Sequence, residues 1–269
     1  MKKIIASLAV AALLLTSCGS VPITGRKQLN LVSDSEVLQS SLASYTSFMN
    51  EVKQKNLVST QKTQSDQVTR VGKRIAAATE AYLKAVGLQN EIQNFAWEFN
   101  LVKSDEMNAW CMPGGKIVVY EGIMKIIKSD DELAVVMGHE VAHAVAKHAN
   151  ERMSQQMAAQ MGANVLGAVL AGQSSQTQSI AQSVYGLGAQ YGVMQPFSRK
   201  HESEADEMGL VLMTNAGYNP DVAITFWQKM NANSSNATPE FLSSHPSHQT
   251  RISDIQKKLP AIKQKYGQK

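Results

Sequence analysis

Apolar positions in the first third of the chain recur with a helical period. The Ser-x-x-Glu spacing of Ser33-Asp34-Ser35-Glu36 is a capping box, so it predicts a helix from about 34 to 55. A second helix, over 66–87, is predicted by apolar residues at helical spacing: Val68, Val71, Ile75 and Ala78. Gly87 can end that helix in a left-handed conformation.

The period then changes to the alternation that is typical of strands. Every second position of one segment is apolar: Phe95, Trp97, Phe99 and Leu101. The stretch from Lys116 to Tyr120 is rich in β-branched residues and follows the turn-forming sequence Pro113-Gly114-Gly115. We expect two strands that pair in antiparallel fashion.

Helical patterns return in the second half of the chain. Ser129-Asp130-Asp131-Glu132 is another capping box and predicts one helix from 130 to about 150, with the sequence MGHEVAHAV (residues 137–145) in its middle. A further buried helix, which Gly217 can end, is indicated by an apolar cluster: Met208, Leu210, Val211 and Leu212. The sequence therefore predicts an α+β fold that is mostly α-helical, with a small β-sheet beside the helix that carries MGHEVAHAV.

The segment 153–195 separates these two helical motifs. It carries Met153, Met157 and Met161 at four-residue spacing and continues with Gly-, Ser- and Gln-rich sequence. Such a segment is either a mobile lid or ordinary helical packing with small residues at close contacts.

Residues 1–17 have the pattern of a secretory signal, since Lys2 and Lys3 precede an apolar run from Ile4 to Leu15 that is too short to cross a membrane. The run ends in Leu15-Thr16-Ser17-Cys18, which resembles a bacterial lipobox, in which the cysteine is lipidated and becomes the first residue. The alternative is an ordinary signal peptide beside a coincidental cysteine. We expect a lipidated tether over 18–33 and one domain over 34–269.

Composition adds limits rather than a function. At 269 residues, with 43% hydrophobic and 18% charged residues, the chain can bury a full core. Its net charge of +4 becomes +2 without Lys2 and Lys3, which is too little to indicate a nucleic-acid partner. If Cys18 is acylated, Cys111 is the one remaining thiol, so we expect no intrachain disulfide.

The sequence HEVAH places His139 and His143 four residues apart, so both imidazoles lie on one helical face and can reach one metal ion. Glu140 lies beside them, where its carboxylate can take a proton from a water that zinc activates. The pattern predicts a catalytic site with one Zn²⁺ per chain. The alternative is a pair of histidines satisfied within a core.

A catalytic zinc site needs a third protein ligand, and Glu202 stands in a suitable helical setting downstream. Asp206 shares its face and is predicted to orient a ligand histidine or a reaction proton. Glu204 lies about 200° around the helix from Glu202, so it should not join the same site.

These motifs resemble those of the HtpX-like and prenyl-protein-endopeptidase family of zinc metallopeptidases, in particular its exported lipoprotein and periplasmic members. The likeness rests on HEVAH, on Glu202-Ser-Glu-Ala-Asp206 after Ser198-Arg199, on Asn108 to Gly115, and on His245-Pro246. It implies a zincin-type fold with a general base at Glu140, a second carboxylate, often viewed as a proton donor, at Asp206, and three metal ligands: His139, His143 and Glu202. Membrane-embedded members have spans that this chain lacks, so their lipidated or intramembrane substrates are not implied.

Two further features have alternative interpretations. Pro246 suits the first turn of a helix, so His245 either approaches the zinc site, as an oxyanion stabiliser or a resting metal ligand, or faces water. The strand Lys116 to Tyr120 is either an interior strand or an edge on which an extended substrate pairs through Gly115, Lys116, Ile117 and Val118. The other histidines are predicted to lie at the surface: His148, His201 and His248.

The sequence thus predicts a zinc metalloendopeptidase that acts on unfolded or misassembled polypeptides of the cell envelope. We expect the lipid on Cys18 to hold it to the bacterial outer membrane, facing the periplasm, because Gly19 follows without an acidic run, as in lipoprotein sorting. The alternative is an assembly factor or chaperone of the envelope assembly machinery, with a structural or latent zinc site.

Overall fold

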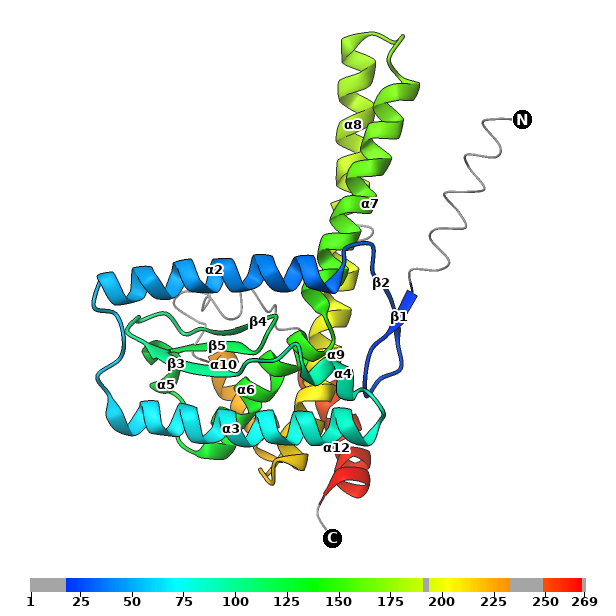
Figure 1. Cartoon of the computed structure of the whole chain (residues 1–269). Helices are drawn as coiled ribbons and strands as arrows, with labels where there is room; N and C mark the ends of the chain where they lie inside the picture. Colours follow the sequence, from blue (N-terminus) through cyan, green and yellow to red (C-terminus); the bar gives the residue numbers. More distant parts are fainter. Residues whose placement is uncertain (1–17, 191–193, 233–248, 268–269) are drawn as a thin grey trace. The chain divides into compact units, whose positions relative to one another are not determined.

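The computed structural model describes residues 18–190, 194–232 and 249–267, and these form two compact units (Figure 1). The smaller unit comprises the N-terminal segment up to Val37 together with Lys147–Lys200. The larger unit comprises Leu38–Ala146 and His201–Lys269. The predicted signal (1–17), His245 and His248 lie outside the described residues.

The larger unit holds most of the helices and a three-stranded sheet. Two of its helices, α2 and α9, begin within the sequence range of the smaller unit. In chain order the elements are α2 (Asp34–Gln54), α3 (Lys62–Ala85), α4 (Gln89–Ile92), β3 (Glu98–Val102), β4 (Ala109–Met112), β5 (Lys116–Tyr120), α5 (Glu121–Met124), α6 (Asp130–Val145), α9 (Gln195–Asn215), α10 (Val222–Ala232) and α12 (Gln249–Tyr266).

The capping boxes act as the sequence predicts. The Ser33 hydroxyl accepts a hydrogen bond from the backbone N–H of Glu36 (3.3 Å), and the Glu36 carboxylate accepts one from the N–H of Ser33 (3.3 Å). At the start of α6, the Ser129 hydroxyl accepts from the N–H of Glu132 (3.2 Å). These bonds satisfy N–H groups that would otherwise lack a partner, which fixes where both helices begin.

The sheet has the order β3-β5-β4, so Lys116–Tyr120 is its central strand. Strand β3 pairs with β5 in parallel, and β4 pairs with β5 in antiparallel fashion. The predicted antiparallel pairing of the first strand with Lys116–Tyr120 is therefore wrong. Gly114 and Gly115 turn the chain back with positive φ angles (93° and 77°), so the hairpin partner of β5 is its sequence neighbour β4. Strand β3 then occupies the other side of β5.

Helices cover both faces of the sheet (Figure 1). Tyr45, Met49 and Val52 of α2 form a buried cluster with Val102 and Val118 on one face. On the other face α3 packs on β3, and α6 packs on β4 and α3. Gly72 allows the first of these contacts, because a Cβ there would lie 2.2 Å from the Phe99 ring. A small sheet therefore lies beside the HEVAH helix, which confirms the predicted fold class.

Helix α6 ends earlier than the sequence predicts. It stops at Val145, and Lys147 adopts a left-handed conformation (φ 54°) before the next helix begins at His148. A non-glycine residue in this region is uncommon, so the interruption could not be read from the helical period of the side chains.

The smaller unit contains a β-hairpin and a helical hairpin. Its elements are β1 (Cys18–Ser20), β2 (Lys27–Leu29), α7 (His148–Val169) and α8 (Ser175–Ala189). Arg26, which follows the β-turn, pairs with Glu151 in the first turn of α7 (2.7 Å and 2.9 Å). The Ser154 hydroxyl accepts a hydrogen bond from the N–H of Leu31 (2.8 Å). The residues of the predicted tether thus include a hairpin that is attached to α7.

Among the described residues, no helix is both long enough and apolar enough to cross a bilayer.

Candidate active site

Helix α6 brings the two histidines of HEVAH together. They lie one turn apart on one face, as predicted, with their Nε2 atoms 3.1 Å apart. His139 is buried, and His143 is largely buried. The imidazoles meet edge to face, so their Nε2 atoms converge on one point.

Helix α9 adds the third predicted ligand at that point. Glu202 places one carboxylate oxygen 3.3 Å from His139 Nε2 and the other 3.5 Å from His143 Nε2. Zinc bonds of about 2.0–2.2 Å with tetrahedral angles put ligand atoms roughly 3.3–3.5 Å apart. The three side chains form the one possible metal cluster found among the described residues, and their donor atoms and separations fit zinc.

Two glycines allow α6 and α9 to cross at this site. A Cβ on Gly138 would lie 2.9 Å from the carbonyl oxygen of Gly209, and a Cβ on Gly209 would lie 2.8 Å from the backbone nitrogen of His139. Larger residues at either position would push the backbones apart. The close crossing therefore sets the distance between His139 on one helix and the two carboxylates on the other.

Asp206 forms a hydrogen bond with the second ring nitrogen of His139. Its Oδ1 atom lies 3.0 Å from His139 Nδ1, one turn of α9 beyond Glu202. Arg251 of α12 binds the same carboxylate through two N–H groups, at 2.5 Å and 2.8 Å. Because a guanidinium can only donate, Asp206 accepts from both partners, and His139 carries its proton on Nδ1. This tautomer leaves the Nε2 lone pair for a metal.

Arg251 is a site residue that the sequence analysis missed. Its guanidinium lies 3.9 Å from the centre of the Trp227 ring on α10, and Trp227 also meets the edge of His139. The available signal was its position, because Arg251 shares the buried face of α12 with Ile255, Leu259 and Ile262. A charged residue on such a face needs a partner, and the nearby carboxylates provide one.

The charges at the site are coupled. Burial and the Arg251 guanidinium lower the pKa of His139, but the Asp206 and Glu202 carboxylates outweigh them and raise it to about 9. Burial raises the pKa of Asp206, but Arg251 and His139 lower it by a larger amount. The pKa of Asp206 therefore lies below its ordinary value. When a metal ion displaces the proton that His139 would otherwise carry at neutral pH, the carboxylates of Glu140, Glu202 and Asp206 exceed the charge of Arg251 by two. A divalent cation would balance that excess.

Glu140 is buried on α6, next to His139 of the metal cluster. Burial and the Glu140 carboxylate both raise the pKa of the Cys111 thiol on β4, and Glu140 also acts electrostatically on Arg251. Helix α6, which carries Glu140, packs on β4, the strand that forms one edge of the described sheet.

Three expectations about other residues need correction. Ile117 and Val118 are fully buried in the central strand, and Lys116 pairs with Glu98 (2.7 Å), so the predicted substrate-binding edge at Gly115–Val118 is wrong. His148 and His201 are buried rather than at the surface. The reason is that helices α7 and α9 each bury the face on which these histidines lie. Glu204 is outside the metal cluster, as predicted, although it is buried too.

A pair of histidines and a glutamate at metal-binding distances, with another buried glutamate beside them, defines a metal-dependent peptide hydrolase of the HExxH type. The sequence profile described as Peptidase family M48 matches residues 62–259. The chain therefore belongs to peptidase family M48. The predicted resemblance is confirmed at the level of this family.

Individual relatives include mitochondrial proteins named as metalloendopeptidases and a bacterial protein named as a protease. The chain is 33% identical over 244 residues to "Mitochondrial metalloendopeptidase OMA1" of Schizosaccharomyces pombe, covering 89% of this chain and 66% of the relative. It is 38% identical over 168 residues to the protein of the same name from Arabidopsis thaliana (62% and 33%). It is 27% identical over 182 residues to "Beta-barrel assembly-enhancing protease" of Escherichia coli (64% and 37%). The chain thus spans between a third and two thirds of these relatives.

Proposed function

We propose that the chain is a zinc metalloendopeptidase with one Zn²⁺ held by His139, His143 and Glu202. The observation that carries the proposal is the convergence of their ligand atoms, at separations of 3.1 to 3.5 Å, from two helices, although His143 and Glu202 are 59 residues apart in sequence. When bound there, zinc supplies a Lewis acid that polarises a carbonyl group and acidifies water to near pH 7.

The surrounding residues then have distinct tasks. Glu140 accepts a proton from the attacking water and passes it to the leaving amine. Asp206 accepts the Nδ1 proton of His139, which keeps the imidazole oriented with Nε2 toward the cluster. Arg251 keeps Asp206 ionised and in place. His245, which lies outside the described residues, is proposed to approach the site as an oxyanion stabiliser or as a resting metal ligand.

The substrate is proposed to be an extended polypeptide. Strand β4, which carries Cys111, is an edge of the described sheet and packs against α6, the helix that carries Glu140. A peptide that added to this edge would make main-chain hydrogen bonds and require little side-chain specificity. Such recognition suits unfolded or misassembled proteins.

We place the enzyme in the bacterial cell envelope, as an exported, lipid-anchored member of its family. The support is the signal-like segment 1–17 with its lipobox-like end at Cys18, together with the similarity to the E. coli relative. The outer membrane, with the domain facing the periplasm, is the proposed location. Cys18→Ala in the full chain should then abolish acylation of the protein with labelled fatty acid, and labelling that persists in this variant would contradict the anchor.

The catalytic proposal is tested by removing and restoring the metal. Chelation should abolish cleavage of unfolded casein, and one equivalent of Zn²⁺ per chain should restore it. A zinc-loaded chain that binds casein without cleaving it would support the alternative of an assembly factor or chaperone. Zinc absorption spectroscopy then separates the two, because a structural site has four protein ligands and a catalytic site keeps one position open.

A further inference from the structure

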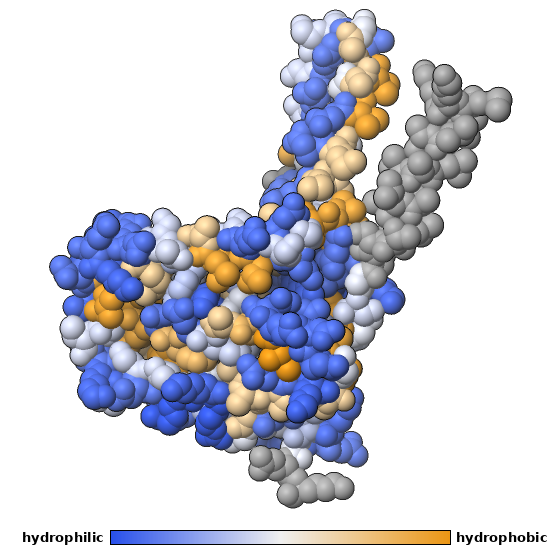
Figure 2. Space-filling model, in the orientation of Figure 1, coloured by the Kyte–Doolittle hydropathy of each residue, from blue (hydrophilic) through white to orange (hydrophobic). Residues whose placement is uncertain are grey.

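The helical hairpin of α7 and α8 exposes apolar side chains along its length. On α7 every fourth residue is apolar, and the exposed fraction rises steadily toward the tip: Met153 (40%), Met157 (44%), Met161 (52%), Val165 (65%) and Val169 (74%). On α8 the exposed apolar residues are Ile180, Val184 and Leu187. We call these residues the apolar stripe. Figure 2 shows hydrophobic residues gathered along one side of the hairpin.

The same segment has no charged side chain. Between Arg152 and Arg199 the sequence contains no Asp, Glu, Lys, Arg or His over 46 residues. At the chain's overall 18% of charged residues, a stretch of this length would carry about eight. The polar positions are amides and hydroxyls instead, for example Gln156, Gln160 and Asn164.

This composition decides between the possible partners. Paired helices and other protein interfaces use flanking charges to set register and partner choice. An anionic surface would be met by Lys and Arg on the polar face. Uncharged amides and hydroxyls hydrogen bond equally well to any headgroup. We therefore propose that the apolar stripe docks the smaller unit on an electrically neutral lipid surface.

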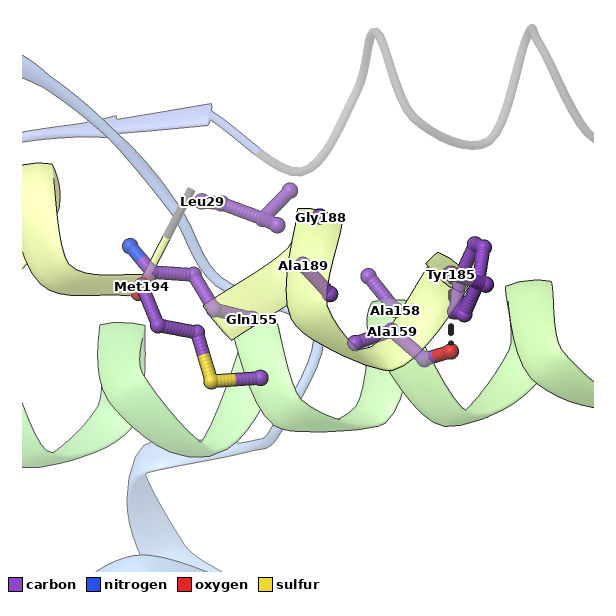
Figure 3. Close-up of a pocket in the computed structure, with 8 residues that line it drawn as sticks. All are labelled: Leu29, Gln155, Ala158, Ala159, Tyr185, Gly188, Ala189 and Met194. Carbon is purple, nitrogen blue, oxygen red and sulfur yellow. Dashed lines mark hydrogen bonds between the residues drawn. The ribbon is translucent and has the colours of Figure 1, made fainter. Parts of the chain in front are cut away.

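A second observation places a lipid-compatible pocket in the same unit. Leu29, Ala158, Tyr185 and Met194 are among the residues around a cavity of about 500 Å³ whose lining carries no charge (Figure 3). The Tyr185 hydroxyl is turned away to donate to the carbonyl of Ala159 (2.9 Å). The pocket is therefore suited to an apolar chain rather than to a polar ligand.

The N-terminal segment leads to this pocket. Cys18 pairs with Leu29 across the β1–β2 ladder, so the predicted lipidation site lies one strand away from the pocket wall. Of the arguments for the proposal, only this one depends on the lipid anchor of the proposed function. Stable attachment commonly combines two membrane signals, and the apolar stripe supplies one that is independent of acylation.

The physical picture is a hairpin that lies in the interface. Helix α7 has 22 residues and is about 33 Å long. Positions four apart advance about 40° around a helix, so the residues nearest the tip, Met161, Val165 and Val169, span about 80° and form the part of the stripe that can enter the headgroup boundary. Apolar faces of such helices are buried by about 5–10 Å, while the polar face stays in water.

The test uses a chain that begins at Cys18, with Cys18→Ser to prevent acylation, since every described residue lies at or after this position. It is floated with phosphatidylcholine vesicles at low salt and at 0.5 M NaCl. The variant Val165→Glu/Val169→Glu places two charges on the stripe. The matched control Gln156→Glu/Gln160→Glu places the same two charges about 180° and 140° from Val165 around the helix. Circular dichroism melting confirms folding of each variant.

We expect the unsubstituted chain and the control to float equally at both salt concentrations, and the stripe variant to float at least tenfold less. Failure of the unsubstituted chain to float, or flotation only with anionic vesicles at low salt, would overturn the proposal. A dimer by light scattering that the stripe variant converts to a monomer would identify a second copy as the partner instead. Binding of unfolded casein that is lost in the stripe variant, by a chain that does not float with vesicles, would identify a polypeptide as the partner instead. Casein cleavage, measured separately, shows whether the peptidase proposal stands or fails on its own.

Discussion

Helix α6 and the α7–α8 hairpin follow each other in the chain, and each departs from the usual rule that ionisable side chains are exposed and apolar ones buried. Helix α6 buries two ionisable groups at its centre, His139 and Glu140, both nearly inaccessible to solvent. The hairpin exposes Val165 and Val169 over most of their surface. A buried charge and an exposed apolar row are each costly unless a partner compensates. We therefore propose a cation as the partner of the first region and an apolar surface as the partner of the second.

The largest effect is expected from removing one of the predicted metal ligands. Glu202→Ala should lose zinc and activity together, with a fall beyond the roughly 100-fold that the outer partners of a ligand typically contribute. Glu204→Ala is the matched control, because Glu204 lies two residues away and outside the metal cluster. Zinc content after dialysis and casein cleavage are the readouts. Loss of zinc from Glu204→Ala alone would show that the ligand assignment on α9 is wrong.

Glu140→Gln should separate proton transfer from metal binding. The amide keeps the shape of the carboxylate but cannot accept a proton, so cleavage should fall by about 100-fold or more while zinc stoichiometry is unchanged. Turnover is measured at saturating substrate. A variant that keeps normal turnover would remove Glu140 from the reaction.

Asp206→Ala should have a smaller effect, because Asp206 orients His139 rather than binding the metal itself. We expect a loss of about 10- to 100-fold in zinc affinity or activity. Arg251→Met tests the same unit from the other side, since it leaves Asp206 without its guanidinium partner. If Asp206→Ala bound zinc as tightly and cleaved as fast as the parent chain, the orienting role would be refuted.

The capping boxes and the helical periods predicted α2, α3 and α6 well, because these signals are local in sequence. Asn108–Gly115 and Lys116–Tyr120 show where local signals stop. The Gly114-Gly115 turn made β4 the hairpin partner of β5, so β3 paired in parallel on the other side. That arrangement depends on contacts between distant segments, which a period does not report.

The site shows the same division. The spacing of HEVAH predicted two of the three residues of the possible metal cluster, and the helical, apolar setting of Glu202 predicted the third. Arg251 was missed because its role arises from the meeting of α6, α9 and α12. His148 and His201 were expected at the surface, and their burial depends on which helical faces pack in the folded chain.

The smallest expected effects are on the free energy of unfolding, which should differ between substitutions in α6 and substitutions on the apolar stripe. Val136→Ala, in the buried part of α6, should lower the free energy of unfolding by about 1–3 kcal/mol. Val165→Ala, on the exposed stripe, should change it by no more than about 0.5 kcal/mol. Denaturant titration of both variants checks this. Equal losses would mean that the stripe packs against protein in solution.

The central claim is that zinc is held by His139, His143 and Glu202, and zinc K-edge absorption of the purified resting protein tests it most directly. The account predicts one zinc per chain, with at least two imidazole nitrogens and a carboxylate oxygen at about 2.0–2.2 Å, and with the oxygen contribution reduced or the zinc lost in Glu202→Ala. A sulfur ligand at about 2.3 Å, or an unchanged spectrum and full zinc occupancy in Glu202→Ala, would contradict it.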